Sequence, residues 1–174
     1  MVQQAFPDSQ FSIISIAHNA DFKIIRTHAS NDPGGYYLFD ASKLVAERLF
    51  SVHPELESYT FAKTETFTFT AVDGKSLEGY LTLPAHSSHQ TLLVMPHGGP
   101  IGIREYDVFD PTLQFYASRG FAILRVNFRG SSGFGKDFKD GGVGESGRLI
   151  ESDINLAVDN VLNRHVFNKT CAIG

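Results

Sequence analysis

The sequence predicts an α/β protein in which a β-rich segment precedes a mostly parallel, doubly wound sheet. Three observations predict this fold class. Short strand-like runs fill the first third, a hairpin pattern surrounds residue 74, and buried strands then alternate with helices. An apolar fraction of 42% and a charged fraction of 20% are typical of a folded globular chain. The change of pattern divides the chain into a β-rich segment, 1–62, and an α/β segment, 63–174.

The β-rich segment reads as short antiparallel strands joined by tight turns. Runs of β-branched and aromatic residues predict strands at 11–16, 22–27 and 36–40, the first two joined at 18–21. Residues 44–50 predict either a fourth strand or a short helix, because Leu, Ala, Glu and Arg weaken the strand pattern. Three or four such strands match one blade of a β-propeller. A small free-standing sheet explains the same pattern.

A hairpin and two buried strands open the α/β segment. Residues 64–70 alternate strictly between polar and apolar, and 77–83 return as the partner strand after the Asp73-Gly74 turn signal. The continuous apolar runs at 91–95 and 121–126 are expected of strands that are buried on both faces. The hairpin is therefore expected at the edge of a parallel sheet.

Two helices are expected between the buried strands. Asp110 and Pro111 predict the start of the first, and Gly120 predicts its end. Apolar residues at spacings of three and four over 150–162 predict the second, whose early acids Glu151 and Asp153 are expected to be solvated. A third parallel strand begins at 171–173. Strand–helix–strand repeated twice is the opening half of an α/β-hydrolase architecture.

Composition narrows the partners and the compartment. The net charge of −4, without any basic run, indicates no nucleic acid and no anionic membrane surface as partner. No run reaches the roughly 18 apolar residues of a membrane span, and residues 1–10 do not form a signal peptide.

The single cysteine, Cys171, is expected to be a buried, inert thiol. The lack of disulfides favours the cytoplasm over the periplasm or secretion. The seven histidines show no metal spacing, so no cofactor is expected.

The segment His97-Gly98-Gly99-Pro100 carries the strongest indication of chemistry. It follows a buried strand, at the carboxyl end where open α/β sheets bind ligands. Two glycines leave the backbone N–H groups uncovered, and such a group can donate to the oxyanion of a tetrahedral intermediate. An ordinary tight turn between strand and loop explains the same residues.

The glycine-rich loop at 127–135 invites two other interpretations, and both fail. Gly135-Lys136 is followed by Asp137, so the hydroxyl that a Walker loop needs for Mg²⁺ is missing. Neither Gly130-Ser131-Ser132-Gly133 nor the stretch around Ser146 completes a Gly-x-Ser-x-Gly nucleophile elbow. Nucleotide binding is rejected, and no nucleophilic serine is identified.

Taken in order, these motifs resemble the prolyl oligopeptidase family of serine peptidases. The resemblance covers nearly the whole chain. It is carried by Asp73-Gly74, 77–84, His97-Gly98-Gly99-Pro100, 118–122 and 127–135, with 33–40 and 44–56 similar to the end of that family's propeller.

The resemblance implies a β-propeller followed by an α/β-hydrolase domain. It also implies hydrolysis of short peptides by a Ser-Asp-His triad through an acyl-enzyme. At matching positions it implies that the backbone N–H of Gly99 is an oxyanion donor, and that His97, Gly98, Pro100 and Arg129 line the site. In some branches a tyrosine hydroxyl at the position of His97 is the oxyanion donor, and the histidine at this position puts the chain outside those branches.

The same resemblance places the serine, aspartate and histidine of the triad beyond Gly174. The chain is therefore expected to be the inactive front part of a peptidase, cut before its nucleophile. An open sheet edge is expected to make this part prone to homo-oligomerise.

Two rivals stay open. An esterase or lipase of the α/β-hydrolase type explains the His97 loop but not the strand-rich first 60 residues. A non-catalytic module that binds a partner through its sheet edge or its site loop explains the missing triad.

Overall fold

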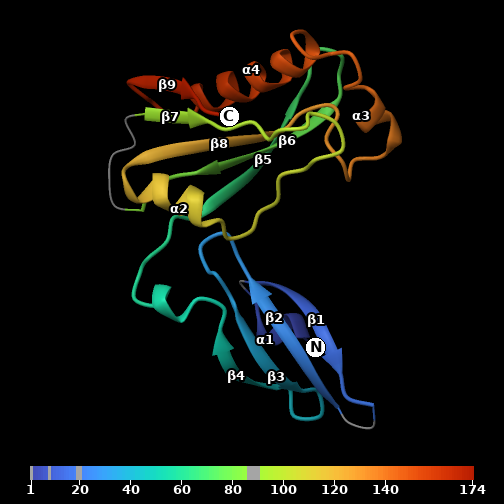
Figure 1. Cartoon of the computed structure of the whole chain (residues 1–174), viewed down its shortest axis with the longest axis vertical. Helices are drawn as coiled ribbons and strands as arrows, with labels where there is room; N and C mark the ends of the chain where they lie inside the picture. Colours follow the sequence, from blue (N-terminus) through green and yellow to red (C-terminus); the bar gives the residue numbers. More distant parts are fainter. Residues whose placement is uncertain (1, 8, 19–20, 86–90) are drawn as a thin grey trace. The chain divides into compact units, whose positions relative to one another are not determined.

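The computed structural model describes residues 2–7, 9–18, 21–85 and 91–174. It divides into two compact units, Met1–Phe61 with Val108–Asp110, and Ala62–Asp107 with Pro111–Gly174. The division between Phe61 and Ala62 lies one residue before the boundary expected from the sequence. Figure 1 shows the helices and strands of both units.

The first unit is built on one antiparallel sheet in the order β1-β2-β3-β4. Its described part contains α1 (Val2–Ala5), β1 (Gln10–Ile16), β2 (Phe22–His28), β3 (Gly35–Asp40), β4 (Val45–Ser51) and the short 3-10 helix η1 (Pro54–Leu56). Its core consists of Phe6, Ile25 and Phe39. The fourth run is a strand, because it pairs with β3 along its length. Asn19 and Ala20, in the predicted connection between the first two strands, lie outside the described residues.

The second unit is built on a mixed sheet in the order β5-β6-β8-β7-β9. Its strands are β5 (Thr64–Thr70), β6 (Ser76–Thr82), β7 (Thr91–Val94), β8 (Phe121–Asn127) and β9 (Lys169–Ala172). The predicted hairpin forms in register, with Thr64 opposite Thr82 and Thr70 opposite Ser76. Strands β8, β7 and β9 are mutually parallel, as the alternating strand and helix pattern predicts.

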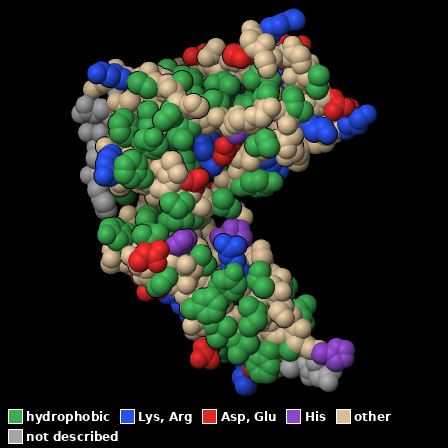
Figure 2. All heavy atoms as spheres, viewed as in Figure 1, with side chains coloured by type: hydrophobic (Ala, Val, Ile, Leu, Met, Phe, Trp, Pro, Cys, Tyr) green, Lys and Arg blue, Asp and Glu red, His purple; other side chains and the backbone are tan. Residues whose placement is uncertain are grey.

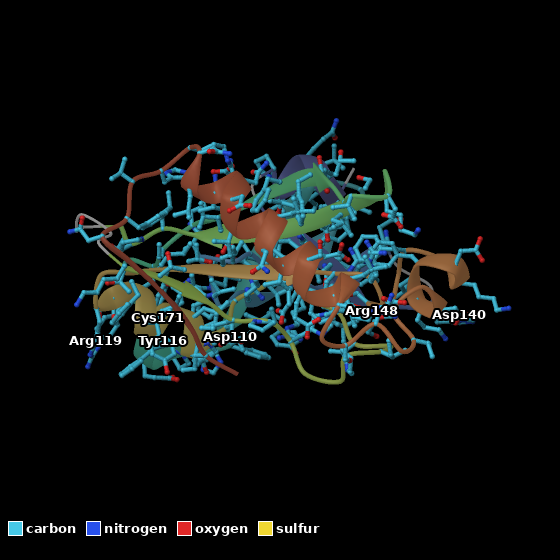
Figure 3. The ribbon with its side chains drawn as sticks, turned by 90° about the horizontal axis from the view of Figure 1, so that it is seen from above. Asp110, Tyr116, Arg119, Asp140, Arg148 and Cys171 are labelled. Carbon is cyan, nitrogen blue, oxygen red and sulfur yellow. The ribbon has the colours of Figure 1, made fainter. Side chains whose placement is uncertain are left out.

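Helices cover both faces of this sheet. Helix α4 (Leu149–Leu162) packs Ile150, Ala157 and Val161 on one face, and α2 (Pro111–Ser118) packs Leu113 and Ala117 on the other. The short α3 (Lys136–Asp140) lies between β8 and α4 in the chain. Figure 3 shows α4 lying across the sheet. The predicted α/β fold is confirmed, and no helix among the described residues is long and apolar enough to cross a membrane.

The prediction for Cys171 was wrong, because its side chain is exposed (Figure 3). All four residues of β9 are exposed, since β9 is an edge strand and neither α2 nor α4 covers it. An apolar run predicts burial only where another element packs against it.

Candidate functional site

The candidate site lies at one end of the second unit's sheet. Because β7 and β8 are parallel, their carboxyl ends meet at the same edge of the sheet. The His97 loop leaves β7 there, and the loop that begins at Phe128 leaves β8 there. The structure therefore brings together the two segments that the sequence singled out.

The backbone of Gly98 and Gly99 is open to a ligand. Both residues are exposed. Gly99 has a φ of 124°, a backbone conformation that residues with a side chain rarely adopt. A Cβ at this position would lie 2.8 Å from Cγ1 of Ile103. Within the described parts of the chain, no hydrogen bond is recorded from either glycine N–H. These donors are therefore available to an acceptor outside the protein.

The His97 side chain is fixed against the neighbouring loop. Its ring stacks on Phe128, with ring centroids 4.3 Å apart. Its Nε2 lies 2.8 Å from Oγ of Ser131, and its Nδ1 lies 2.9 Å from the carbonyl oxygen of Gly98. The Ser131 hydroxyl donates to the carbonyl oxygen of Phe128 at 2.7 Å, so Ser131 Oγ accepts from His97 Nε2–H. In this tautomer of the neutral ring Nδ1 carries no hydrogen, so its approach to the Gly98 carbonyl oxygen is a close contact and not a hydrogen bond. His97 thus lies between the glycine backbone and Ser131 and is hydrogen-bonded to Ser131.

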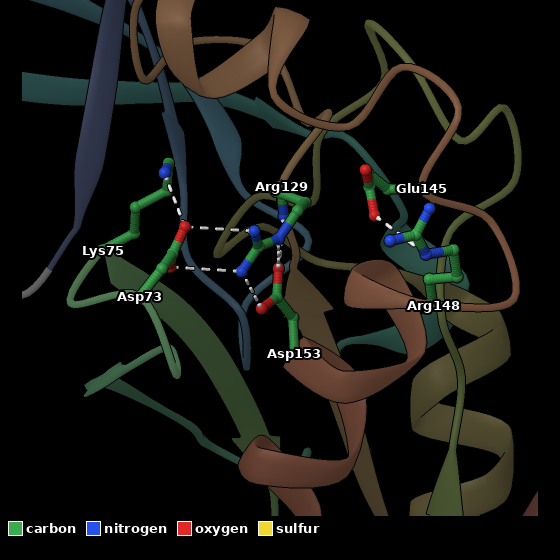
Figure 4. Close-up of polar contacts among 6 residues, drawn as sticks. All are labelled: Asp73, Lys75, Arg129, Glu145, Arg148 and Asp153. Carbon is green, nitrogen blue, oxygen red and sulfur yellow. Dashed lines mark hydrogen bonds and ion pairs between the residues drawn. The ribbon is translucent and has the colours of Figure 1, made fainter.

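The Arg129 guanidinium lies in a buried ion pair behind the loop (Figure 4). Its Nε donates to Asp153 Oδ2 at 2.8 Å and its Nη2 donates to Asp153 Oδ1 at 2.7 Å. Asp73 accepts from Nη1 and Nη2 at 3.2 and 3.3 Å. The side chains of Arg129 and Asp153 are 2% and 0% exposed, against 35% for Asp73. Hydrogen bonding to Asp153 raises the pKa of Arg129, so the guanidinium stays charged. A role of Arg129 in lining a peptide site stays a prediction.

The sequence interpretation missed Asp153 as a structural carboxylate. It was expected to be solvated at the helix start, and that expectation was wrong, because its side chain is buried among the apolar residues of α4. A signal was present in the spacing. Asp153 follows Ile150 by three residues and precedes Ala157 by four, so it shares their buried face. An acid in that stripe needs a buried cation.

A second polar cluster holds Arg104 and Glu105, which follow the His97 loop in the chain. Oε1 of Glu78 accepts from Asn127 Nδ2 at 3.0 Å and from Arg104 Nη2 at 3.2 Å, and it also accepts from the Tyr80 hydroxyl. Oδ1 of Asn127 accepts from the backbone N–H of Glu105 at 2.8 Å. Burial, followed by the bond to Glu78, raises the pKa of Tyr80 to about 12, so the phenol stays a donor at neutral pH.

Asp73 is expected to make the second unit sensitive to acid. Hydrogen bonding to Lys75, followed by hydrogen bonding to Arg129, lowers the pKa of Asp73 from 3.8 to about 2. A carboxyl whose pKa is lower in the folded state stabilises the fold above its unfolded pKa. That contribution to stability is lost as the pH falls through the pKa that the carboxyl has in the folded state. Between about pH 4 and pH 2, the free energy of unfolding should fall more in the wild type than in Asp73→Asn.

Urea unfolding across this pH range measures the difference between the two proteins. The pKa of Asp40, in the first unit, is also lowered to about 2, chiefly by its bond from the Ser42 hydroxyl. Asp40 is unchanged in both proteins, so the difference isolates Asp73. Parallel curves for wild type and variant would show that Asp73 has no such role.

No metal site is found in the structured part of the chain. Among the described residues, no group of three or more His, Cys, Asp or Glu side chains could hold a metal ion. His86 and His89 lie outside the described residues. The arrangement offers backbone donors at a sheet edge, a fixed imidazole and one buried structural carboxylate, that of Asp153.

Comparison with known proteins finds relatives of this chain. Residues 107–174 match the prolyl oligopeptidase family. The chain is 30% identical to dipeptidyl peptidase family member 6 of Caenorhabditis elegans, over 94% of this chain and 25% of that protein. It is 35% identical to dipeptidyl aminopeptidase BIII of Pseudoxanthomonas mexicana, over 78% of this chain and 21% of that protein.

Solved structures of peptidases are also similar to this chain. An acylaminoacyl peptidase in complex with Z-Gly-Gly-Phe-chloromethyl ketone matches with a TM-score of 0.68 and 25% identity, over 87% of this chain and 24% of that chain. The acylaminoacyl peptidase of Pyrococcus horikoshii shares the fold, with a TM-score of 0.70, 24% identity and coverage of 90% and 25%. The chain spans about a quarter of the length of these proteins. As its motifs predict, this chain is related to the prolyl oligopeptidase family of peptidases.

Proposed function

We propose that this chain is part of a serine peptidase that hydrolyses short peptides through an acyl-enzyme, and that Gly99 N–H is one of its oxyanion donors. The observation that carries the proposal is the exposed Gly98-Gly99 backbone, which leaves β7 at the ligand-binding edge of the sheet. A fixed backbone N–H stabilises the negative charge that develops on the carbonyl oxygen during acyl transfer. The relatives' names, which are peptidase names, support the reaction class.

The residues beside this donor are proposed to border the peptide. His97, Gly98 and Pro100 flank the Gly99 N–H in the chain, and His97 is held in place by its stacking on Phe128. Arg129 belongs to the same edge through its backbone, since its guanidinium is engaged by Asp153 and Asp73. No cofactor is needed for acyl transfer of this type.

The first unit is proposed to be the last blade of a β-propeller. Its four antiparallel strands follow one another in order, as in a blade. Hydrophobic side chains gather on its surface (Figure 2), and their exposure supports packing against further blades. Those that are at least 40% exposed on its sheet or at its turns are Ile13, Ile14, Ile16, Phe22, Leu44, Val45, Leu49 and Phe50.

Short peptides are the proposed partners, with no nucleic acid or membrane. Association of copies through a sheet edge is also proposed. It is supported by β9, an edge strand of the second unit with all four residues exposed.

These 174 residues alone are expected to hydrolyse no peptide, because their sequence contains no Gly-x-Ser-x-Gly elbow. The test compares this chain with the full product of its gene. Each is incubated with aminoacyl and acylaminoacyl 4-nitroanilides as amide substrates, with the corresponding 4-nitrophenyl esters, and with a fluorophosphonate that labels activated serines. We expect release of nitroaniline and labelling from the full product, and neither from the 174-residue chain.

The other outcomes separate the alternatives. Hydrolysis of esters without hydrolysis of amides would indicate an esterase. A full product that neither reacts with the fluorophosphonate nor hydrolyses either substrate would overturn the proposal and favour a binding module. Labelling of the 174-residue chain itself would refute its inactivity.

A further inference from the structure

Two loops at the carboxyl edge of the second sheet contact each other along their lengths. We name residues 97–104 the glycine loop and residues 128–135 the arginine loop. The backbone N–H of Gly102 donates to the carbonyl oxygen of Gly130 at 2.8 Å, and the N–H of Ser132 donates to that of Ile103 at 2.9 Å. Together with the contact of His97 with Ser131, these bonds align the glycine loop on the arginine loop.

Glycines allow this close approach. A Cβ at Gly130 would lie 2.8 Å from Cδ1 of Ile101, and a Cβ at Gly133 would lie 2.3 Å from Nη1 of Arg104. Both glycines also have positive φ angles, 101° and 86°. Any other residue at either position would strain the backbone and force the side chain of Ile101 or Arg104 to move away.

The arginine loop is held from behind by buried groups. Besides its guanidinium contacts, Arg129 donates its backbone N–H to Asp153 Oδ2 at 3.0 Å, so α4 holds both the main chain and the side chain. The N–H of Gly130 donates to the carbonyl oxygen of Phe138, at 3.0 Å, in α3. The arginine loop is therefore fixed by two helices, whereas Gly98 and Gly99 are exposed.

We infer that Ser131 and Arg129 are positioning residues for the Gly99 N–H. Ser131 acts through the His97 ring, and Arg129 acts by holding the arginine loop on α4. An oxyanion donor contributes most when it is already fixed before the charge develops, and an exposed glycine pair cannot fix itself. The inference rests on the proposed function only in assigning a use to the fixed N–H.

The chain offers a matched pair of variants in adjacent serines. Ser131→Ala removes the hydroxyl that contacts His97. Ser132→Ala keeps its backbone bond to Ile103, and in the described residues its hydroxyl makes no recorded hydrogen bond. In the 174-residue chain, ¹⁵N relaxation gives the order parameters of the Gly98 and Gly99 amides. We expect a fall from about 0.85 to below about 0.6 in Ser131→Ala, and no change in Ser132→Ala.

A second variant tests the contact of Arg129 with Asp153. Arg129→Lys keeps the charge but loses the two-pronged contact with Asp153, so the order parameters of both glycines should fall again. Protection of the β5–β6 amides from hydrogen exchange shows whether the fold persists. If Arg129→Lys does not fold, Ser131→Ala decides alone. Unchanged glycine order parameters in folded Ser131→Ala would overturn the inference.

Kinetics of the full gene product separate this inference from the proposed function. Ser131→Ala is expected to lower kcat for a peptide amide about 10- to 100-fold with little change in KM, because only the donor's position changes. If the wild type hydrolyses nothing while the order parameters respond as expected, the proposed function fails and the positioning stands. If the wild type is active and Ser131→Ala changes neither kcat nor the order parameters, the positioning fails and the function stands.

Discussion

Replacing Asp153 with asparagine is expected to lower the free energy of unfolding by about 3 kcal/mol. Asp153 is fully buried and accepts three hydrogen bonds from Arg129, two from the guanidinium and one from the backbone. The amide keeps the shape of the carboxylate but carries no charge and only one acceptor. Arg129 would then be left buried with Asp73 alone. Removing one partner of a buried ion pair typically costs about 3–5 kcal/mol, and the contact with Asp73 keeps the expected loss near the lower end.

Urea unfolding of the chain, followed by circular dichroism, measures this loss. Glu65→Gln is the matched control. It makes the same chemical change in an ion pair with Arg164, whose two side chains are 47% and 35% exposed. Exposed pairs contribute about 0–1 kcal/mol, so the control should stay close to wild type. Equal losses in both variants would show that burial of the Arg129 pair adds nothing.

The elements of this fold were predictable because their patterns are local. The alternation at 64–70, the Asp73-Gly74 turn and the partner run at 77–83 specify a hairpin without reference to the rest of the chain. The structure forms it in register. In the same way, Pro111 and Gly120 bracket α2, which spans Pro111–Ser118.

The partners of buried charges were not predictable in this way. Arg129 reaches Asp153 across 24 residues and Asp73 across 56, and no local pattern encodes either distance. On the sequence, Arg129 is one cation in a polar loop, and only the family resemblance assigned it to the lining of a site. Asp153 is one acid near a helix start, so it was expected to be solvated. Each residue reveals its role only when the sheet brings α4 beside the loop.

The location of the candidate site was predictable from the sequence, but the contacts within it were not. The two glycine-rich segments each follow an apolar run, and parallel strands place such segments at one edge. Which residues of the two segments touch depends on backbone geometry. The contact between His97 and Ser131 joins positions that are 34 residues apart. In the sequence, Ser131 is only the residue before Ser132 in an incomplete Gly-x-Ser-x-Gly pattern, whereas the structure shows its hydroxyl bonded to the Phe128 carbonyl.

Replacing Gly142 with alanine is expected to destabilise the second unit by about 1–3 kcal/mol, because it forces a methyl group into the back of the arginine loop. A Cβ at Gly142 would lie 2.5 Å from Cα of Gly130 and 2.8 Å from the carbonyl oxygen of Arg129. These are backbone atoms, so no side-chain rotation relieves the contact. The segment around Gly142 and the arginine loop must separate instead, which weakens the packing that holds Arg129.

Gly98→Ala is the control for this substitution. A Cβ at Gly98 meets nothing within 4 Å, and neither Gly98 nor Gly142 has a positive φ, so the two variants differ only in the space around the added methyl group. Gly98→Ala should therefore change the free energy of unfolding by less than about 0.5 kcal/mol. Urea unfolding of both variants gives the comparison. If Gly142→Ala proves as stable as Gly98→Ala, the arginine loop is not packed against Gly142 as closely as the structure shows. If Gly142→Ala is destabilised and also lowers the order parameters of the Gly98 and Gly99 amides, the arginine loop transmits the disturbance to the glycine loop, as its alignment requires.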